Sequence, residues 1–259
     1  QAEAKLGVNH TVTVLTRKHL ADYYFRTGHI TKAIPLYRIF NKSTEHRLSL
    51  KSSREDSQLK LVGCLEFIEA QAEALSIIRS FEKNPALSNE FRFKALYETV
   101  QILCLTDING KALRNEYKTY IGLTGLPPEK DPLYFYIEGI IADSSGNIEL
   151  ARNYFKKSIP GFEKMGISGK KYLSDVHECI GFTYLWWGNN PDLALQHQKI
   201  GVKINSTFLG PTHPLTAMRK LWLSWALMEN GMLKECGETA EEVDRIFVEK
   251  LGANSSWRI

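Results

Sequence analysis

The histidines and cysteines of this chain do not stand at the spacings that metal sites and catalytic pairs require. Seven histidines and four cysteines are scattered over 259 residues, and no two cysteines form a C-x-x-C pair. A zinc-protease helix needs two histidines four residues apart, and the segment His177-Glu178 lacks the second one. His10 and His213 each follow a Leu-Gly pair at the same distance, which favours a structural role such as capping the next helix. We therefore expect no metal site.

Motifs for nucleotide binding and nucleophilic catalysis do not occur either. The sequence contains no G-x-x-x-x-G-K-S/T, no G-x-G-x-x-G after a strand, no G-x-S-x-G elbow and no plausible Cys–His pair. Residues 166–171, Gly-Ile-Ser-Gly-Lys-Lys, could form an anion-binding loop, but a solvated linker ahead of a helix is the better interpretation. Asp143 and Glu229 lie at predicted helix ends, where carboxylates are normally solvated. We expect no catalytic residue and no cofactor.

Charge, hydropathy and cysteine usage exclude several further classes of protein. The net charge of +4 comes from 33 basic and 29 acidic residues that are thoroughly mixed, so this segment is not expected to bind nucleic acid directly. No apolar run approaches the roughly 18 residues of a membrane helix. Each cysteine lies among apolar residues of a predicted helix, which favours buried free thiols and hence a reducing, cytoplasmic location. The cysteines are Cys64, Cys104, Cys179 and Cys236.

Two distant segments of the chain share one pattern of residues. Each begins with Leu-Gly-x-x-His, at Leu6 and at Leu209, and each has a second glycine 21 residues after the first. A small residue follows in each segment, Ala33 in the first and Cys236 in the second, 27 residues after the leading leucine. Between these marks, apolar residues recur at helical spacing, so each segment predicts two amphipathic helices. The second glycine suits the left-handed turn that ends the first helix.

The same pattern recurs between these two segments, clearly in two copies and in degenerate form in two more. The small residue of each second helix is separated from the next by 41, 38, 39, 43 and 42 residues. In the fourth copy we expect Pro160 to break the second helix, and in the fifth an extra residue falls around Asn190-Pro191. The sequence therefore predicts six helical hairpins, covering residues 6–47, 53–86, 89–125, 131–165, 172–208 and 209–250.

The repeat resembles the tetratricopeptide repeat family. Its period of about 42 residues and its Leu-Gly-x-x-His linker are similar to the subtype of kinesin light chains, which also occurs in bacterial and fungal signalling proteins. The resemblance implies an all-α fold, a right-handed superhelix (α-solenoid) that forms a single array over residues 1–259. Neither end reads as a polar cap, so we expect the chain to be part of a longer array.

The resemblance also implies a concave groove lined by the first helix of each hairpin. Ten residues of those helices are expected to contact a protein or peptide there: Lys18, Asp22, Arg26, Tyr97, Tyr136, Glu178, Phe182, Trp186, Trp225 and Glu229. Family members that grip a terminal carboxylate use Lys, Arg and Asn on successive repeats, and only Lys18 fits that pattern. The asparagine-rich first helix of kinesin light chains is absent as well, since Leu221-Trp-Leu-Ser stands in its place.

Aromatic residues stand where those motifs would lie, and they gather toward the second half of the chain. Packing between repeats is the alternative interpretation for each of them. However, Trp186 and Trp187 are adjacent, so on one helix at least one should reach the surface. We expect a non-catalytic scaffold that binds an apolar peptide or helix, as the sensor or partner-binding part of a larger signalling or transcription regulator. The alternatives are control of an enzymatic domain in the same parent chain, a cargo adaptor like kinesin light chain, and self-association through open ends.

Overall fold

A computed structural model describes residues 5–82, 87–104, 110–187 and 190–252. Its described part contains twelve α-helices and no strand, which confirms the all-α class. The chain divides into two compact units, residues 1–102 and 103–259, with the boundary at the end of α6. The first unit contains α2 Thr11–Arg26, α3 Ile30–Ser43, α4 Lys51–Phe67, α5 Gln71–Glu82 and α6 Asn89–Leu103. The second contains α7 Lys111–Thr124, α8 Pro132–Ser144, α9 Ile148–Lys164, α10 Lys170–Phe182, α11 Pro191–Leu209, α12 Pro214–Glu229 and α13 Leu233–Leu251.

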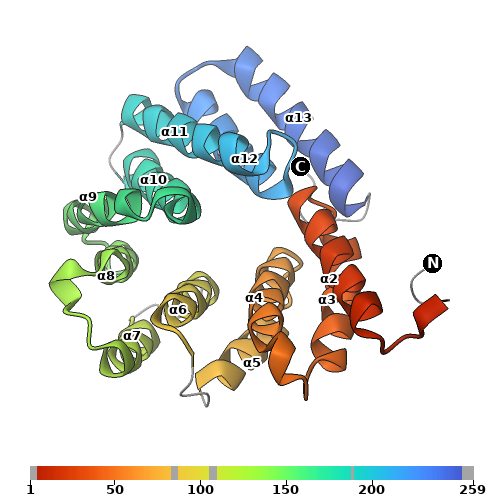
Figure 1. The fold of residues 1–259 in the computed structure, drawn as a ribbon. Helices are drawn as coiled ribbons and strands as arrows, with labels where there is room; N and C mark the ends of the chain where they lie inside the picture. Colours follow the sequence, from red (N-terminus) through yellow and green to blue (C-terminus); the bar gives the residue numbers. More distant parts are fainter. Residues whose placement is uncertain (1–4, 83–86, 105–109, 188–189, 253–259) are drawn as a thin grey trace. The chain divides into compact units, whose positions relative to one another are not determined.

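Each of the six predicted repeat segments contains two successive helices. Within the units, α2 packs on α3, α4 on α5, α8 on α9, α10 on α11 and α12 on α13 (Figure 1). Contacts also join one hairpin to the next, as between α3 and α4 or between α11 and α12. The hairpins therefore stack as repeats within each unit, while a single array over the whole chain stays a prediction.

A common hydrogen-bonded closure ends the first helix of four hairpins. In the first, Gly28 adopts a left-handed conformation (φ 78°), and the backbone N–H of His29 bonds to the carbonyl oxygen of Tyr24, five residues back, at 2.8 Å. The same five-residue bond joins Asn147 to Ala142, at 2.8 Å. It recurs from Met232 to Leu227 and from Ala70 to Leu65. This is the Schellman arrangement, in which a residue with positive φ lets the chain satisfy the last helical carbonyls.

In the fifth hairpin, the turn after the first helix contains one residue more than in the other four. There the N–H of Asn190 bonds to the carbonyl oxygen of Tyr184, six residues back, at 3.2 Å. The segment Thr183–Trp187 is a π-helix, the local form that an extra residue in a helix often produces. The insertion predicted around Asn190-Pro191 thus lies between Tyr184 and Asn190. Gly188, the expected turn glycine of this hairpin, lies outside the described residues.

Small residues allow the helices of a hairpin to approach closely. Ala33, Ala74, Ala151 and Ala194 are fully buried, as expected for positions where two helices cross. A Cβ atom added at Gly139 of α8 would lie 2.5 Å from the ring of Phe155 on α9, so only glycine fits there. In the degenerate third repeat the expected residue Ala112 is only half-buried, and Leu113 beside it is fully buried.

Two sequence expectations about helix ends have different outcomes. His10 and His213 do cap their helices: each Nδ1 accepts a hydrogen bond at 3.2 Å from the N–H two residues later. The expectation that Pro160 breaks a helix was wrong, because α9 continues through it to Lys164. Proline removes only one backbone donor, and the amphipathic packing of the 17-residue helix α9, with Phe155 and Phe162 buried, offsets that loss. None of the described helices is long and apolar enough to cross a membrane.

Candidate partner-binding surface

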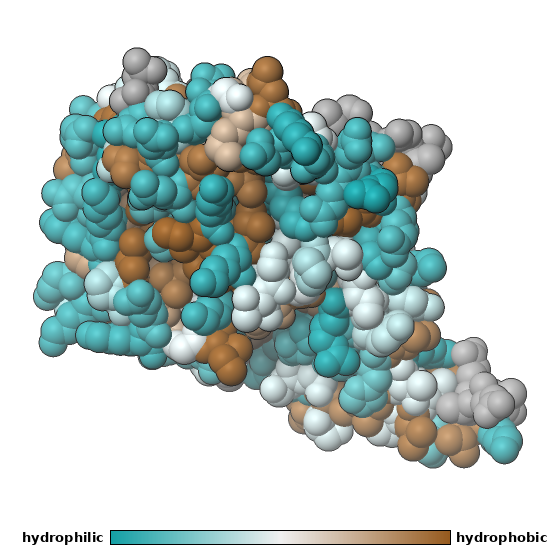
Figure 2. Space-filling view, turned by 90° about the horizontal axis from the view of Figure 1, so that it is seen from above, coloured by the Kyte–Doolittle hydropathy of each residue, from teal (hydrophilic) through white to brown (hydrophobic). Residues whose placement is uncertain are grey.

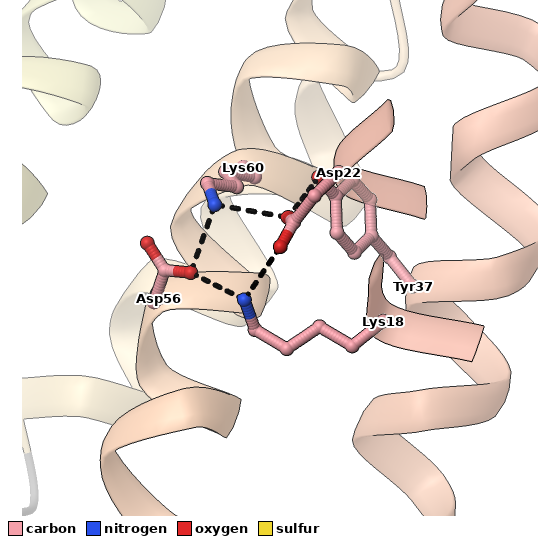
Figure 3. Close-up of polar contacts among 5 residues, drawn as sticks. All are labelled: Lys18, Asp22, Tyr37, Asp56 and Lys60. Carbon is pink, nitrogen blue, oxygen red and sulfur yellow. Dashed lines mark hydrogen bonds and ion pairs between the residues drawn. The ribbon is translucent and has the colours of Figure 1, made fainter. Parts of the chain in front are cut away.

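In the first unit, two of the expected groove residues belong to an ionic cluster that is closed on itself (Figure 3). Lys18 Nζ lies 2.8 Å from Asp22 Oδ2 and 2.9 Å from Asp56 Oδ2. Lys60 Nζ lies 2.9 Å from Asp22 Oδ1 and 2.9 Å from Asp56 Oδ2. Tyr37 of α3 donates its hydroxyl proton to Asp22 Oδ1 at 2.9 Å. Two positive and two negative charges thus cancel between α2 and α4.

The pKa shifts in this cluster follow from its pairing. Burial is the largest influence on the pKa of Asp22 and would raise it, but hydrogen bonds from both lysines and Tyr37 hold it below its usual value. The pKa of Asp56 is lowered by the same lysines against the same effect of burial. Burial would lower the pKa of Lys18, yet its two carboxylate partners raise it. All three groups are therefore charged at neutral pH, and a charged ligand would have to break an existing pair to bind here.

The other two expected groove residues of the first unit differ in exposure. Arg26, the last residue of α2, is exposed. Tyr97 is 0% exposed, which corrects the interpretation that it lines an open face. The sequence placed its helix correctly but could not show which side of that helix the neighbouring helices cover. In this unit the structure does not bring the four expected residues together into one binding surface.

The second unit contains a cluster of four aromatic rings, named here the aromatic cluster: Phe182, Trp186, Trp222 and Trp225. Phe182 and Trp186 are stacked, with ring centroids 4.8 Å apart and planes 14° apart. Trp222 meets Phe182 edge to face at 5.1 Å and Trp225 at 5.6 Å. Trp186 and Trp225 lie 6.1 Å apart with planes tilted by 57°. These contacts link the end of α10 and its π-helix to α12.

The aromatic cluster is built of two half-buried rings and two exposed ones. Phe182 and Trp222 are half-buried, whereas Trp186 is 52% and Trp225 43% exposed. Trp187 is also exposed, by 64%, so both adjacent tryptophans reach the surface.

Hydrophobic side chains are exposed elsewhere on the described part of the chain as well. Figure 2 shows one face of the molecule, on which hydrophilic side chains predominate and hydrophobic ones gather in smaller patches between them. Scattered apolar residues are normal on a protein surface, whereas contiguous ones mark interaction sites. Met228 is 47% exposed and lies three residues after Trp225 on α12. The aromatic cluster is therefore the feature that most resembles a binding surface.

Two acidic residues expected beside the aromatic rings have different surroundings. Glu178 forms an ion pair with Arg219, which also binds Asp175. Burial raises the pKa of Asp175, and the guanidinium of Arg219 acts against that rise. Glu229, the last residue of α12, is exposed and has no ion-pair partner in the described part of the chain. Of the two, only Glu229 offers its charge to a ligand.

Tyr136, also expected in the groove, is buried. It is 2% exposed and packs against the rings of Phe155 and Phe162, at 6.0 and 6.3 Å. Its hydroxyl lies 3.9 Å from Cys179 Sγ. As with Tyr97, the structure corrects the sequence interpretation, because rings from α9 cover this side of α8. The structure thus brings Phe182, Trp186 and Trp225 together and leaves both tyrosines in the core.

Several residues that matter at these sites were not among the sequence predictions. Asp56 and Lys60 complete the ionic cluster, and their i, i+4 spacing on a helix was a usable signal. Trp222 supports both Phe182 and Trp225, and its spacing of three residues from Trp225 also pointed to a shared face. Arg219 gave no such signal, because both of its partners lie about 40 residues away in the sequence.

A pair of histidines joins α10 to α11. Their Nδ1 atoms, in His177 and His197, lie 2.9 Å apart, and Tyr184 stacks on His197 with ring centroids 5.9 Å apart. Burial is the main cause that lowers both pKa values, that of His197 to about 4. The pair is therefore neutral at pH 7, with one nitrogen donating to the other. Among the described residues, no group of three or more His, Cys, Asp or Glu could hold a metal ion.

Comparisons with known proteins find likeness only at the level of structure. No family model and no curated protein matches the sequence. The structure is similar to a crystal structure from Podosopora anserina, which contains nearly identical TPR-like repeats of a protein assigned as a kinesin light chain. The sequence identity is 15% and the TM-score is 0.37. That match covers 93% of this chain and 97% of the other. A point variant of that protein gives 15% identity and a TM-score of 0.37, with coverage of 92% and 96%. At such scores the fold assignment rests on this chain's own helices and closures.

Proposed function

We propose that this chain is a tetratricopeptide-type helical repeat that binds a protein partner through the aromatic cluster of its second unit. The observation that carries the proposal is the exposure of Trp186 and Trp225 above two half-buried rings that fix them in place. Aromatic anchors dominate the energetics of many protein interfaces, because large rigid rings bury area at little cost in entropy. The chain acts as a non-catalytic scaffold in this proposal.

The proposed binding surface covers only part of the second unit and does not extend as a groove along all repeats. The lysine and aspartates of the first unit already bind one another, and the two tyrosines are buried. A partner segment would gain most from covering Trp186, Trp225 and Met228, each of which could contribute about 1–3 kcal/mol if it becomes a buried anchor. Within a larger regulator, such a surface would recruit a partner or hold another domain of the same protein.

A matched set of variants tests this proposal. The native chain and a Trp186→Ala/Trp225→Ala double variant are compared as baits in a pull-down from source lysate, with quantitative mass spectrometry. We expect a specific partner to be reduced at least about tenfold on the double variant, since two anchors are lost. Phe208→Ala serves as the control, because this phenylalanine is also exposed but lies near the end of α11.

Circular dichroism confirms that each variant is folded, and purified partner is then titrated against all three proteins. Equal retention by the native chain and the folded double variant would contradict the proposal and move the site away from the aromatic cluster. If the native chain captured nothing specific and its mass rose with concentration in light scattering, self-association would replace it. Loss of capture with Phe208→Ala alone would place the interface on α11.

A further inference from the structure

The exposed part of the aromatic cluster has features that favour a positive charge, and we propose that it receives an arginine side chain of the protein partner. This inference rests on the proposed function and deepens it, by naming the chemistry of the residue that is recognised. It is carried by three properties of the same place: two tryptophan rings that are about half exposed, one exposed carboxylate without an ion-pair partner among the described residues, and two helix C-terminal ends.

The ring faces come first. Aromatic faces carry partial negative charge and attract a guanidinium within about 6 Å of the ring centroid. The ring centroids of Trp186 and Trp225 are 6.1 Å apart and the ring planes are tilted by 57°. The two rings are therefore not stacked on each other and lie at an angle. Phe182 and Trp222 contact these rings from the half-buried side, which keeps them in place.

A carboxylate on α12 can pair with such a positive charge. Glu229 follows Trp225 by one helical turn on α12, so both lie on one face of that helix, and its carboxylate is exposed without an ion-pair partner among the described residues. Arg219 is the single arginine of α12. It forms ion pairs with both Asp175 and Glu178. Lys220, the other cation of α12, is paired with Glu242.

The helix ends act in the same direction. α12 ends at Glu229, so Trp225 lies about one turn from its C-terminal end. The π-helix that continues α10 ends at Trp187, directly after Trp186. The C-terminal end of a helix carries a partial negative charge that attracts cations over about one turn. Arginine suits such a site better than lysine, because its planar and weakly hydrated guanidinium stacks on rings.

The test compares a charged probe with a neutral one of nearly the same shape. N-acetyl-arginine amide and N-acetyl-citrulline amide are titrated into the chain, and the indole N–H signals of its five tryptophans are followed by NMR. We expect the signals of Trp186 and Trp225 to shift with the arginine probe, with an affinity about fivefold above that for citrulline. Glu229→Gln should reduce that ratio, while Glu241→Gln, an exposed glutamate of α13, should leave it unchanged.

A further variant separates ring chemistry from apolar contact. Trp186→Leu keeps an apolar side chain but removes the ring face, so the preference for arginine over citrulline should fall. Equal affinity for both probes, or no shift of either indole signal, would overturn the inference. If the double variant of the pull-down still lost its partner, the proposed function would stand with an apolar ligand. If the double variant retained its partner while the native chain still preferred the arginine probe over the citrulline probe, the proposed function would fail but the arginine preference would stand.

Discussion

Asp22 and Trp225 occupy equivalent positions in two repeats, 203 residues apart, yet they have opposite surroundings. Asp22 accepts hydrogen bonds from two lysines and a tyrosine, so its polar atoms are satisfied within the first unit. Trp225 is supported by other rings on one side and exposed on the other. Charged groups lose much of their attraction for a ligand once they are paired, whereas a half-exposed ring still has apolar area to bury. The comparison assigns stability to the first cluster and binding to the second.

The largest effect that would sharpen this comparison is expected for Asp22→Ala. It leaves the buried hydroxyl of Tyr37 without its acceptor, and it leaves Lys18 and Lys60 to share the single carboxylate of Asp56. We expect the first unit to lose about 2–3 kcal/mol of unfolding free energy, measured by urea unfolding followed by circular dichroism. All tryptophans of the sequence lie at position 186 or later, so tryptophan fluorescence follows the second unit alone and should not change.

Asp56→Ala is the matched control for that experiment. Asp56 binds the same two lysines, but its side chain is 49% exposed against 17% for Asp22, and Tyr37 donates to Asp22. Surface ion pairs contribute about 0–1 kcal/mol, so this variant should cost less than 1 kcal/mol. If Asp22→Ala were no more destabilising than Asp56→Ala, the cluster would not be the stabilising element that the comparison requires.

The stability of the two units should depend on acid pH in different ways. The pKa values of His177 and His197 are lowered in the folded protein, the latter to about 4. Their neutral pairing thus stabilises the second unit above pH 6.5, and this contribution is lost as the pH falls from 6.5 toward 4. Allowing for the partial exposure of the pair, we expect a loss of roughly 1 kcal/mol. Burial raises the pKa values of Asp131, Asp143 and Asp175, which act in the opposite sense.

The histidine contribution is therefore measured as a difference. Urea unfolding followed by tryptophan fluorescence is compared between the native chain and His197→Gln at pH 7 and pH 5. The native chain should lose more stability on acidification than the variant, and equal losses would show that the pair is not responsible. In the first unit the pKa values of Asp22 and Asp56 are lowered, so their contribution to stability is lost only below about pH 4. The pKa of Lys18 is raised, so its contribution to stability is lost above about pH 10.5.

The smallest effect concerns the helical closures. Glu69 adopts φ 60° at the position that Gly28 and Gly231 fill in other hairpins, and a side chain with a Cβ is strained there by about 1 kcal/mol. Glu69→Gly should therefore stabilise the first unit by up to about 1 kcal/mol, seen as a higher urea midpoint. The reverse change in the second unit, Gly231→Ala, should cost a similar amount. Destabilisation by both substitutions would show that the closures of the two units are not equivalent.

Much of the local structure was predictable from sequence, because it depends on residues close together in the chain. The helical periodicity, the turn glycines Gly28 and Gly231 and the histidine caps all act within a few residues of themselves. The buried alanines could be found from the repeat spacing, because each repeat places its small residue at the same point of its second helix. The prediction failed at Pro160, where burial of one face of α9 outweighs the cost of a missing donor.

The sequence alone thus determined that this chain forms helical hairpins with small residues at their crossings, since spacing and backbone preference specify both. Only the tertiary structure decided which aromatic residues are available to a partner. Tyr97, Tyr136, Trp186 and Trp225 were equivalent candidates in the sequence, yet the first two are buried and the last two are exposed. Exposure depends on which neighbouring helix covers each face, and the side chains that cover it are well separated from the residue in the sequence. The same is true of Lys18 and Asp22, whose charges are cancelled by side chains of α4.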